Sequence, residues 1–188
     1  MENFLERNLI FLPRYNQELA TKLATMEKLD HDYALDSAES GNAILSIDGL
    51  PANNPIDPSI EVETIFGALP HNESDNFYIL AGMEIGYMFD YFIENCNGYI
   101  IVFEPWLDSL RVAFELIDFS KSLRKEKVFV VTNVQELDAA LAFRRKPNSQ
   151  IHLCANKFFQ HFYAENLSEM QNHIDILNAT EPENKAIF

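Results

Sequence analysis

Hydrophobic residues recur every three or four positions over residues 3–29, a spacing typical of helices that bury one face. Pro13 interrupts this pattern, so we expect two helices or one kinked helix there. Over residues 32–48 the pattern changes to an alternation of apolar and polar positions around the turn sequence Ser40-Gly41-Asn42. This alternation predicts a β-hairpin after the N-terminal helical arm.

A proline-rich stretch, residues 49–58, then separates the hairpin from a further helix. Asp57 can accept a hydrogen bond from the first turn of that helix, and Pro58 suits its first position. The helix is expected to end near Leu69. We therefore assign residues 1–70 to an N-terminal region made of a helical arm, a β-hairpin and a connecting helix.

From residue 76 onward, short continuous apolar runs alternate with segments of helical periodicity. The predicted strands are residues 77–80, 99–103, 128–131 and 150–154, and the predicted helices are 85–95, 107–117, 134–144 and 156–177. Continuous apolar strands separated by amphipathic helices indicate a parallel sheet that is covered on both faces. Residues 71–188 are therefore predicted to form a Rossmann-like α/β domain, with a mainly parallel sheet flanked by helices.

The charge of the chain disfavours two classes of partner. It has 29 acidic and 14 basic residues, and its formal net charge is −15. Such a surface repels nucleic acids and anionic membranes, and no apolar run approaches the roughly 18 residues of a membrane span. Cys96 and Cys154 form no Cys-x-x-Cys pair, so we expect no metal site. A cytoplasmic location is expected, with Cys154 acting as a small buried hydrophobe.

Candidate chemistry lies at the end of the first predicted parallel strand, in the segment Gly82-Met83-Glu84-Ile85-Gly86-Tyr87. Ligands of open parallel sheets bind beyond the carboxyl ends of the strands. Gly82 suits a tight turn, and Gly86 allows the following helix to pack closely on the strand. Glu104 ends the next strand, 22 residues after Gly82, where dinucleotide-binding folds hold ribose hydroxyls.

Glu84 occupies the middle position of this loop, where a glycine would let the backbone approach a ligand. Its bulk and charge oppose a pyrophosphate more than they oppose an S-adenosyl group, which carries no phosphate. A strand-to-helix turn that binds nothing is the alternative interpretation of the loop, and Glu104 on its own could be a solvated strand end.

At this loop the sequence resembles the N-terminal domain of the motility-associated factor (Maf) flagellin glycosyltransferases. The shared features are a strand, a glycine-rich turn ending in Gly86-Tyr87, a helix, and a strand ending in Glu104-Pro105. Asp118-Phe119-Ser120 and the segment Asn54–Pro58 are also similar. The resemblance covers roughly residues 1–150.

The resemblance implies a role in transferring nonulosonic sugars to flagellin from nucleotide-activated donors. The family's transfer activity is attributed to a central domain that follows this one, so no catalytic residue is carried over. This chain is accordingly expected to be a non-catalytic N-terminal or stand-alone accessory domain. Its expected partners are flagellin, a separate catalytic domain or a second copy of the chain. Its candidate ligand-binding residues for a nucleotide, a nucleotide-sugar or S-adenosylmethionine are Gly82, Glu84, Gly86, Tyr87, Glu104 and Pro105.

Three further interpretations stay open on the sequence alone. An S-adenosylmethionine-dependent methyltransferase is an alternative function, since the Gly82 loop and Glu104 would suit its ligand, although the chain shows no later catalytic motif of that class. The basic cluster Arg144-Arg145-Lys146 fits a solvated helix end better than a phosphate site. The aromatic group at residues 158–163 fits core packing, with a docking face as the alternative.

Overall fold

Parallel strands form the larger of two sheets in the computed structural model, which describes residues 2–69, 74–142 and 144–180. The strands are β4 (Phe77–Ala81), β5 (Tyr99–Phe103), β6 (Val128–Val131) and β7 (Ile151–Cys154). Their order across the sheet is β6-β5-β4-β7, and every neighbouring pair is parallel. The predicted α/β fold with a parallel sheet is confirmed, and β7 returns to lie beside β4 rather than beside β6.

Helices follow these strands as the periodicity predicts. They are α4 (Tyr87–Asn95), α5 (Leu107–Leu116), α6 (Ser120–Leu123), α7 (Val134–Leu141), α8 (Lys157–Phe162) and α9 (Ala164–Ala179). The prediction of one helix over residues 156–177 is wrong, because the backbone of Tyr163 leaves the helical region (φ −103°, ψ 25°) between α8 and α9. The short helix α6 was not predicted.

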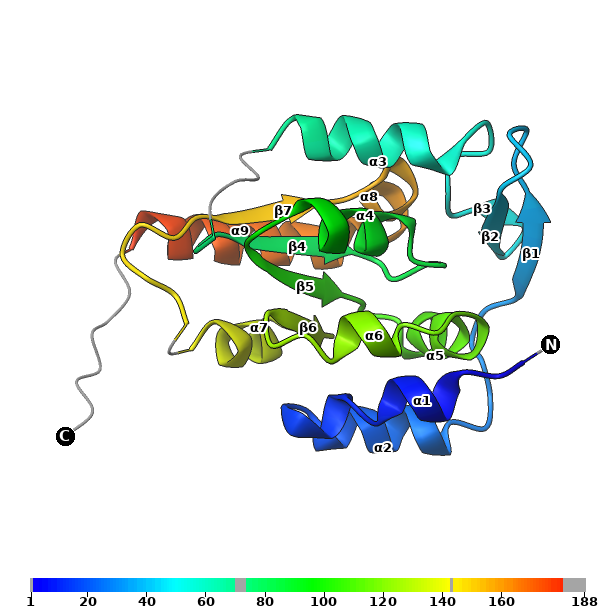
Figure 1. The fold of residues 1–188 in the computed structure, drawn as a ribbon, viewed down its shortest axis with the longest axis horizontal. Coiled ribbons are helices and arrows are strands. Elements are labelled where there is room, and N and C mark those ends of the chain that lie inside the picture. Colours follow the sequence, from blue (N-terminus) through cyan, green and yellow to red (C-terminus); the bar gives the residue numbers. More distant parts are fainter. Residues whose placement is uncertain (1, 70–73, 143, 181–188) are drawn as a thin grey trace.

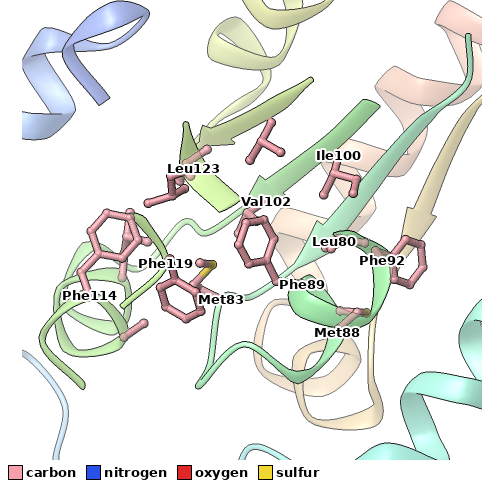
Figure 2. Packing of buried hydrophobic residues seen from close by; sticks show 14 of the residues in the cluster. Leu80, Met83, Met88, Phe89, Phe92, Ile100, Val102, Phe114, Phe119 and Leu123 are labelled. Carbon is pink, nitrogen blue, oxygen red and sulfur yellow. The ribbon is translucent and has the colours of Figure 1, made fainter. Parts of the chain in front are cut away.

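Each face of the parallel sheet carries its own apolar core, because successive strand residues point to opposite faces. On one face, Leu80 and Val102 pack with residues of α4, α5 and the segment around Phe119 (Figure 2). On the other face, Ile79 and Ile101 pack with α7, α8 and α9. The helices therefore cover both faces of the sheet, as expected from the continuous apolar strands.

The N-terminal arm consists of α1 (Leu5–Leu9), the 3-10 helix η1 (Leu12–Arg14) and α2 (Gln17–Thr25), so Pro13 does interrupt the helical pattern. These helices pack beside α5 and α6 and contribute Leu12, Leu19 and Leu23 to the first core (Figure 1). Buried Asn8 ties the arm in place: its amide group donates to the carbonyl oxygens of Phe114 and Ile117, and its oxygen accepts from the Phe119 N–H. The proposed division of the chain at residue 70 stays a prediction.

Side chains cap both edges of the parallel sheet. On the β6 edge, the Tyr15 hydroxyl accepts from the Val130 N–H at 3.0 Å. On the β7 edge, the Asn178 amide pairs with both the N–H and the C=O of Ile151, at 3.0 and 2.9 Å. The Arg14 guanidinium donates to four carbonyl oxygens at or just before β6, those of Leu123, Arg124, Lys125 and Val128. Exposed sheet edges invite pairing with other chains, and these contacts occupy part of each edge.

A smaller antiparallel sheet lies at the carboxyl ends of the parallel strands (Figure 1). It consists of β1 (Tyr33–Ser37), β2 (Ala43–Ile47) and β3 (Leu50–Pro51), in that order. The predicted hairpin is therefore confirmed, and β3 is an addition to it. Leu45 and Ile47 pack against Ile85 of the glycine loop and Val112 of α5. The next helix, α3 (Pro58–Gly67), begins as predicted, with the Asp57 side chain accepting from the Ser59 N–H at 2.9 Å.

Candidate functional site

The strand order creates a topological switch point between β4 and β7. From β4 the chain proceeds through β5 to β6 on one side, then crosses to β7 on the other side. The helix after β4 packs on one face and the helix after β7 on the opposite face. The loops that leave the two strands therefore diverge, and in open α/β sheets ligands bind in that crevice. The predicted glycine loop lies at this point.

Aromatic rings fill the space beside both glycines of the loop. Gly82 and Gly86 have φ angles of +84° and +94°, a conformation that favours glycine. A Cβ atom on Gly82 would lie 2.2 Å from the Phe159 ring, and one on Gly86 would lie 2.5 Å from the Phe119 ring. Both glycines thus serve the packing of side chains from distant parts of the chain.

Glu84 is buried in the crevice and also has a positive φ, of 51°. Its two carboxylate oxygens accept hydrogen bonds from the side-chain amides of Asn53 and Asn156. Asn53 follows β3, and Asn156 precedes α8. Burial is the main cause that raises the pKa of Glu84 well above its ordinary value, and the nearby Glu61 charge raises it further.

Glu104 is fully buried at the end of β5, beside the glycine loop. One oxygen accepts from the Met83 N–H and the Ser109 hydroxyl, each at 3.1 Å. The other oxygen accepts from the Trp106 N–H at 3.2 Å and from the Tyr163 hydroxyl. The predicted juxtaposition of the loop and this carboxylate is therefore present. Burial raises the pKa of Glu104 to about 7, although its hydrogen-bond donors act in the opposite direction.

The remaining predicted residues lie at the margin of the crevice. The Tyr87 hydroxyl donates to the carbonyl oxygen of Ala43 at 2.8 Å, which joins the start of α4 to β2. Pro105 is half-buried and follows Glu104 into the loop before α5. The structure thus brings the six predicted residues to one end of the sheet. Whether they bind a ligand stays a prediction.

An open groove of about 600 Å³ runs beside the crevice. One wall is the segment from Leu50 to Ile56, and the other is α8 with Phe158 and Phe162. Phe159 and Tyr163 are buried, whereas Phe158 and Phe162 are partly exposed and stack at 4.2 Å. The aromatic group therefore divides between core packing and the wall of this groove.

Basic residues follow the C-terminal end of α7. Arg144 lies just after α7 and donates to the carbonyl oxygens of Ala140 and Ala142, as expected for a cation at a helix end. Within the described ranges, no group of three or more His, Cys, Asp or Glu side chains could hold a metal ion. No helix in the same ranges is long and apolar enough to cross a membrane.

Comparison with known proteins finds a solved structure with a similar fold. No family model and no curated protein matches the sequence. The structure is similar to that of the MAf glycosyltransferase from Magnetospirillum magneticum AMB-1, with a TM-score of 0.61 and 14% sequence identity. The chain has the fold of part of a Maf glycosyltransferase. The match covers 93% of this chain and 35% of the Maf glycosyltransferase, so the chain spans about a third of that protein's length. The resemblance inferred from the motifs is confirmed for the fold.

Sequence reasoning missed the partners of the two glutamates. Tyr163, read only as a core aromatic residue, donates to Glu104, and Asn53 and Asn156 donate to Glu84. Asn156 carried one usable signal, because an asparagine directly before a helical pattern is a good N-cap, and it does accept from the Phe159 N–H at 2.9 Å. Asn53 lay in a proline-rich loop and gave no signal.

Proposed function

We propose that this chain is a non-catalytic domain of a Maf-type flagellin-glycosylation protein, either its N-terminal part or a stand-alone accessory form. The similarity to part of the Maf glycosyltransferase supports the family assignment. The loop from Gly82 to Tyr87 and the pair Glu104-Pro105, which carried the sequence resemblance, lie together at the switch point.

The observation that carries the non-catalytic role is the saturation of Glu104. A carboxylate that holds a ribose needs free oxygen lone pairs facing the ligand. Both oxygens of Glu104 instead accept two bonds each from within the chain. Beside it, the Phe159 ring packs against Gly82, and the Glu84 side chain is buried. A nucleotide or nucleotide-sugar pocket at this position is therefore vestigial in our proposal.

The same observation opposes the methyltransferase alternative. An S-adenosylmethionine site at this loop would use Glu104 to hold the ribose diol. Binding would then require the carboxylate to release Tyr163 or the backbone N–H groups of Met83 and Trp106. Each buried donor left without a partner costs about 1–3 kcal/mol, so the closed arrangement is favoured.

A thermal-shift titration tests the closed pocket. CMP, CMP-activated sugars, S-adenosylmethionine and S-adenosylhomocysteine are each added to the purified chain, because a ligand that binds the folded state raises its melting temperature. We expect no shift with any of them. A rise with CMP compounds would show a working nucleotide-sugar pocket, and a rise with the S-adenosyl compounds alone would favour the methyltransferase.

A second experiment tests the role in flagellin glycosylation. Deleting the coding sequence for this chain in its own organism should lower the glycan mass on flagellin, measured by intact-protein mass spectrometry. The purified chain, mixed with flagellin and a CMP-activated nonulosonic sugar, should add no mass. An unchanged flagellin in the deletion strain would refute the accessory role, and sugar transfer by the chain alone would refute the non-catalytic one.

A further inference from the structure

Three loops that are distant in the sequence meet at the Glu84 carboxylate. Glu84 follows β4, Asn53 belongs to the segment after β3, and Asn156 lies between β7 and α8. Both asparagine side chains donate to the carboxylate, and the Asn156 amide also donates to the carbonyl oxygen of Ala52 at 2.9 Å. The antiparallel sheet, the parallel sheet and the start of α8 are thereby joined at one buried point.

The backbone fixes the direction of both asparagine amides. The Asn53 oxygen accepts from the Leu45 N–H at 2.9 Å, and the Asn156 oxygen accepts from the Phe159 N–H at 2.9 Å. Each side-chain NH2 group must therefore point the other way, toward Glu84. The carboxylate is the group in this cluster that can accept from both amides, one on each oxygen.

Glu84 keeps its side chain in a backbone conformation that usually belongs to glycine. Its φ of 51° lies in the left-handed region, as do those of Gly82 and Gly86 in the same loop. The loop would thus accept a glycine here with less strain. A buried glutamate at such a position is explained by the bonds that its carboxylate makes to the two neighbouring loops.

We propose that Glu84 is a latch that closes the switch point by holding the antiparallel sheet and the start of α8 against the glycine loop. This inference deepens the proposed function, since it names the contact that keeps the pocket shut. The latch also sets the width of the neighbouring groove, because Asn53 belongs to one wall and Asn156 directly precedes the helix that forms the other. The Tyr87–Ala43 hydrogen bond is a second tie between the same two sheets.

Hydrogen–deuterium exchange of the whole chain tests the latch through two variants. Glu84→Gly removes the carboxylate while suiting the left-handed backbone, and Glu84→Gln keeps the size but only one accepting oxygen. In Glu84→Gly, the amides of residues 44–53 and 155–159 should exchange at least about tenfold faster, as expected for loss of two buried hydrogen bonds. Glu84→Gln should give a smaller acceleration in the same two segments.

Asn8→Ala serves as the matched control. Asn8 is also buried, and its side chain bonds three backbone groups, but it joins α1 to the α5–α6 segment, away from the switch point. This variant should accelerate exchange at Phe119 and leave residues 44–53 and 155–159 no more affected than the rest of the chain. The latch is refuted if Glu84→Gly speeds all protected amides equally, speeds only one of the two segments, or leaves both unchanged.

The wild-type chain gives a reading that does not depend on whether a variant folds. In exchange measured over increasing urea below the unfolding transition, the amides of Leu45 and Phe159 should open in one step, with equal protection and equal urea dependence. Separate opening steps would refute the latch. The ligand titration and the flagellin assay test the proposed function, and neither of them measures hydrogen exchange. Failure of the latch can therefore be distinguished from failure of the proposed function.

Discussion

Replacing Glu104 by glutamine tests whether one buried carboxyl group controls the pH dependence of folding. Glu104 is fully buried, and its pKa is raised from an ordinary value of 4.5 to about 7. A carboxyl group with a raised pKa in the folded state binds its proton more tightly there than in the unfolded chain. Its contribution to stability is therefore fully present below pH 4.5 and is lost as the pH rises toward 7.

The difference between these two pKa values corresponds to about 3 kcal/mol of unfolding free energy. The Glu104 titration should thus lower the stability of the wild-type chain by about that much between mildly acidic and neutral pH. Glu84 has a pKa shifted in the same direction and adds to the loss. Glu104→Gln removes the Glu104 titration, so the stability of this variant should fall less steeply over the same range.

Urea denaturation at several pH values between about 5 and about 8 measures this slope. Trp106 is the single tryptophan of the sequence, and its backbone N–H donates to Glu104, so its fluorescence reports on the relevant region. The slope is the readout, because the glutamine NH2 group would face the backbone N–H of Met83 or of Trp106 and lower stability at every pH. Glu126→Gln, at an exposed position before β6, controls for the loss of a surface carboxylate. A Glu104→Gln profile parallel to that of the wild type would refute the reasoning.

Three further predictions follow from packing and burial. Gly82→Ala should lower the free energy of unfolding by more than about 3 kcal/mol, because the new Cβ atom would meet the Phe159 ring. Gly41→Ala should lower it by only about 1 kcal/mol, because Gly41 has a similar φ but open space around it. Urea midpoints compare the two variants, and equal losses would contradict the packing argument. Arg14→Lys should lower the free energy of unfolding by about 2 kcal/mol, because an ammonium group cannot bond four carbonyl oxygens. A melting temperature equal to that of the wild type would show that the contacts of Arg14 at β6 are dispensable. Cys154 should resist iodoacetamide at mildly alkaline pH until the chain unfolds, because burial raises the pKa of its thiol to about 12; rapid labelling of the native chain, seen by mass spectrometry, would contradict this burial.

The sequence by itself determined the order and type of most elements, because the signals for them are local. Continuous apolar runs such as Tyr99–Phe103 became buried parallel strands, and Asp57 with Pro58 marked the start of α3. The glycine loop and Glu104 could also be placed at one end of the sheet. Parallel neighbouring strands end on the same side, so two local assignments were enough to bring these segments together.

The tertiary structure alone decided what surrounds that loop. The position of β7 beside β4, the Phe159 ring over Gly82, and the donors to the two glutamates all join residues far apart in the sequence. Asn53 and Asn156 lie 31 and 72 residues from Glu84, and Tyr163 lies 59 residues from Glu104. Such contacts leave no periodic pattern in the sequence, because they depend on how finished helices and strands pack. For this reason the side chains that pack around the glycine loop, including the Phe159 ring beside Gly82, could not be predicted from the sequence.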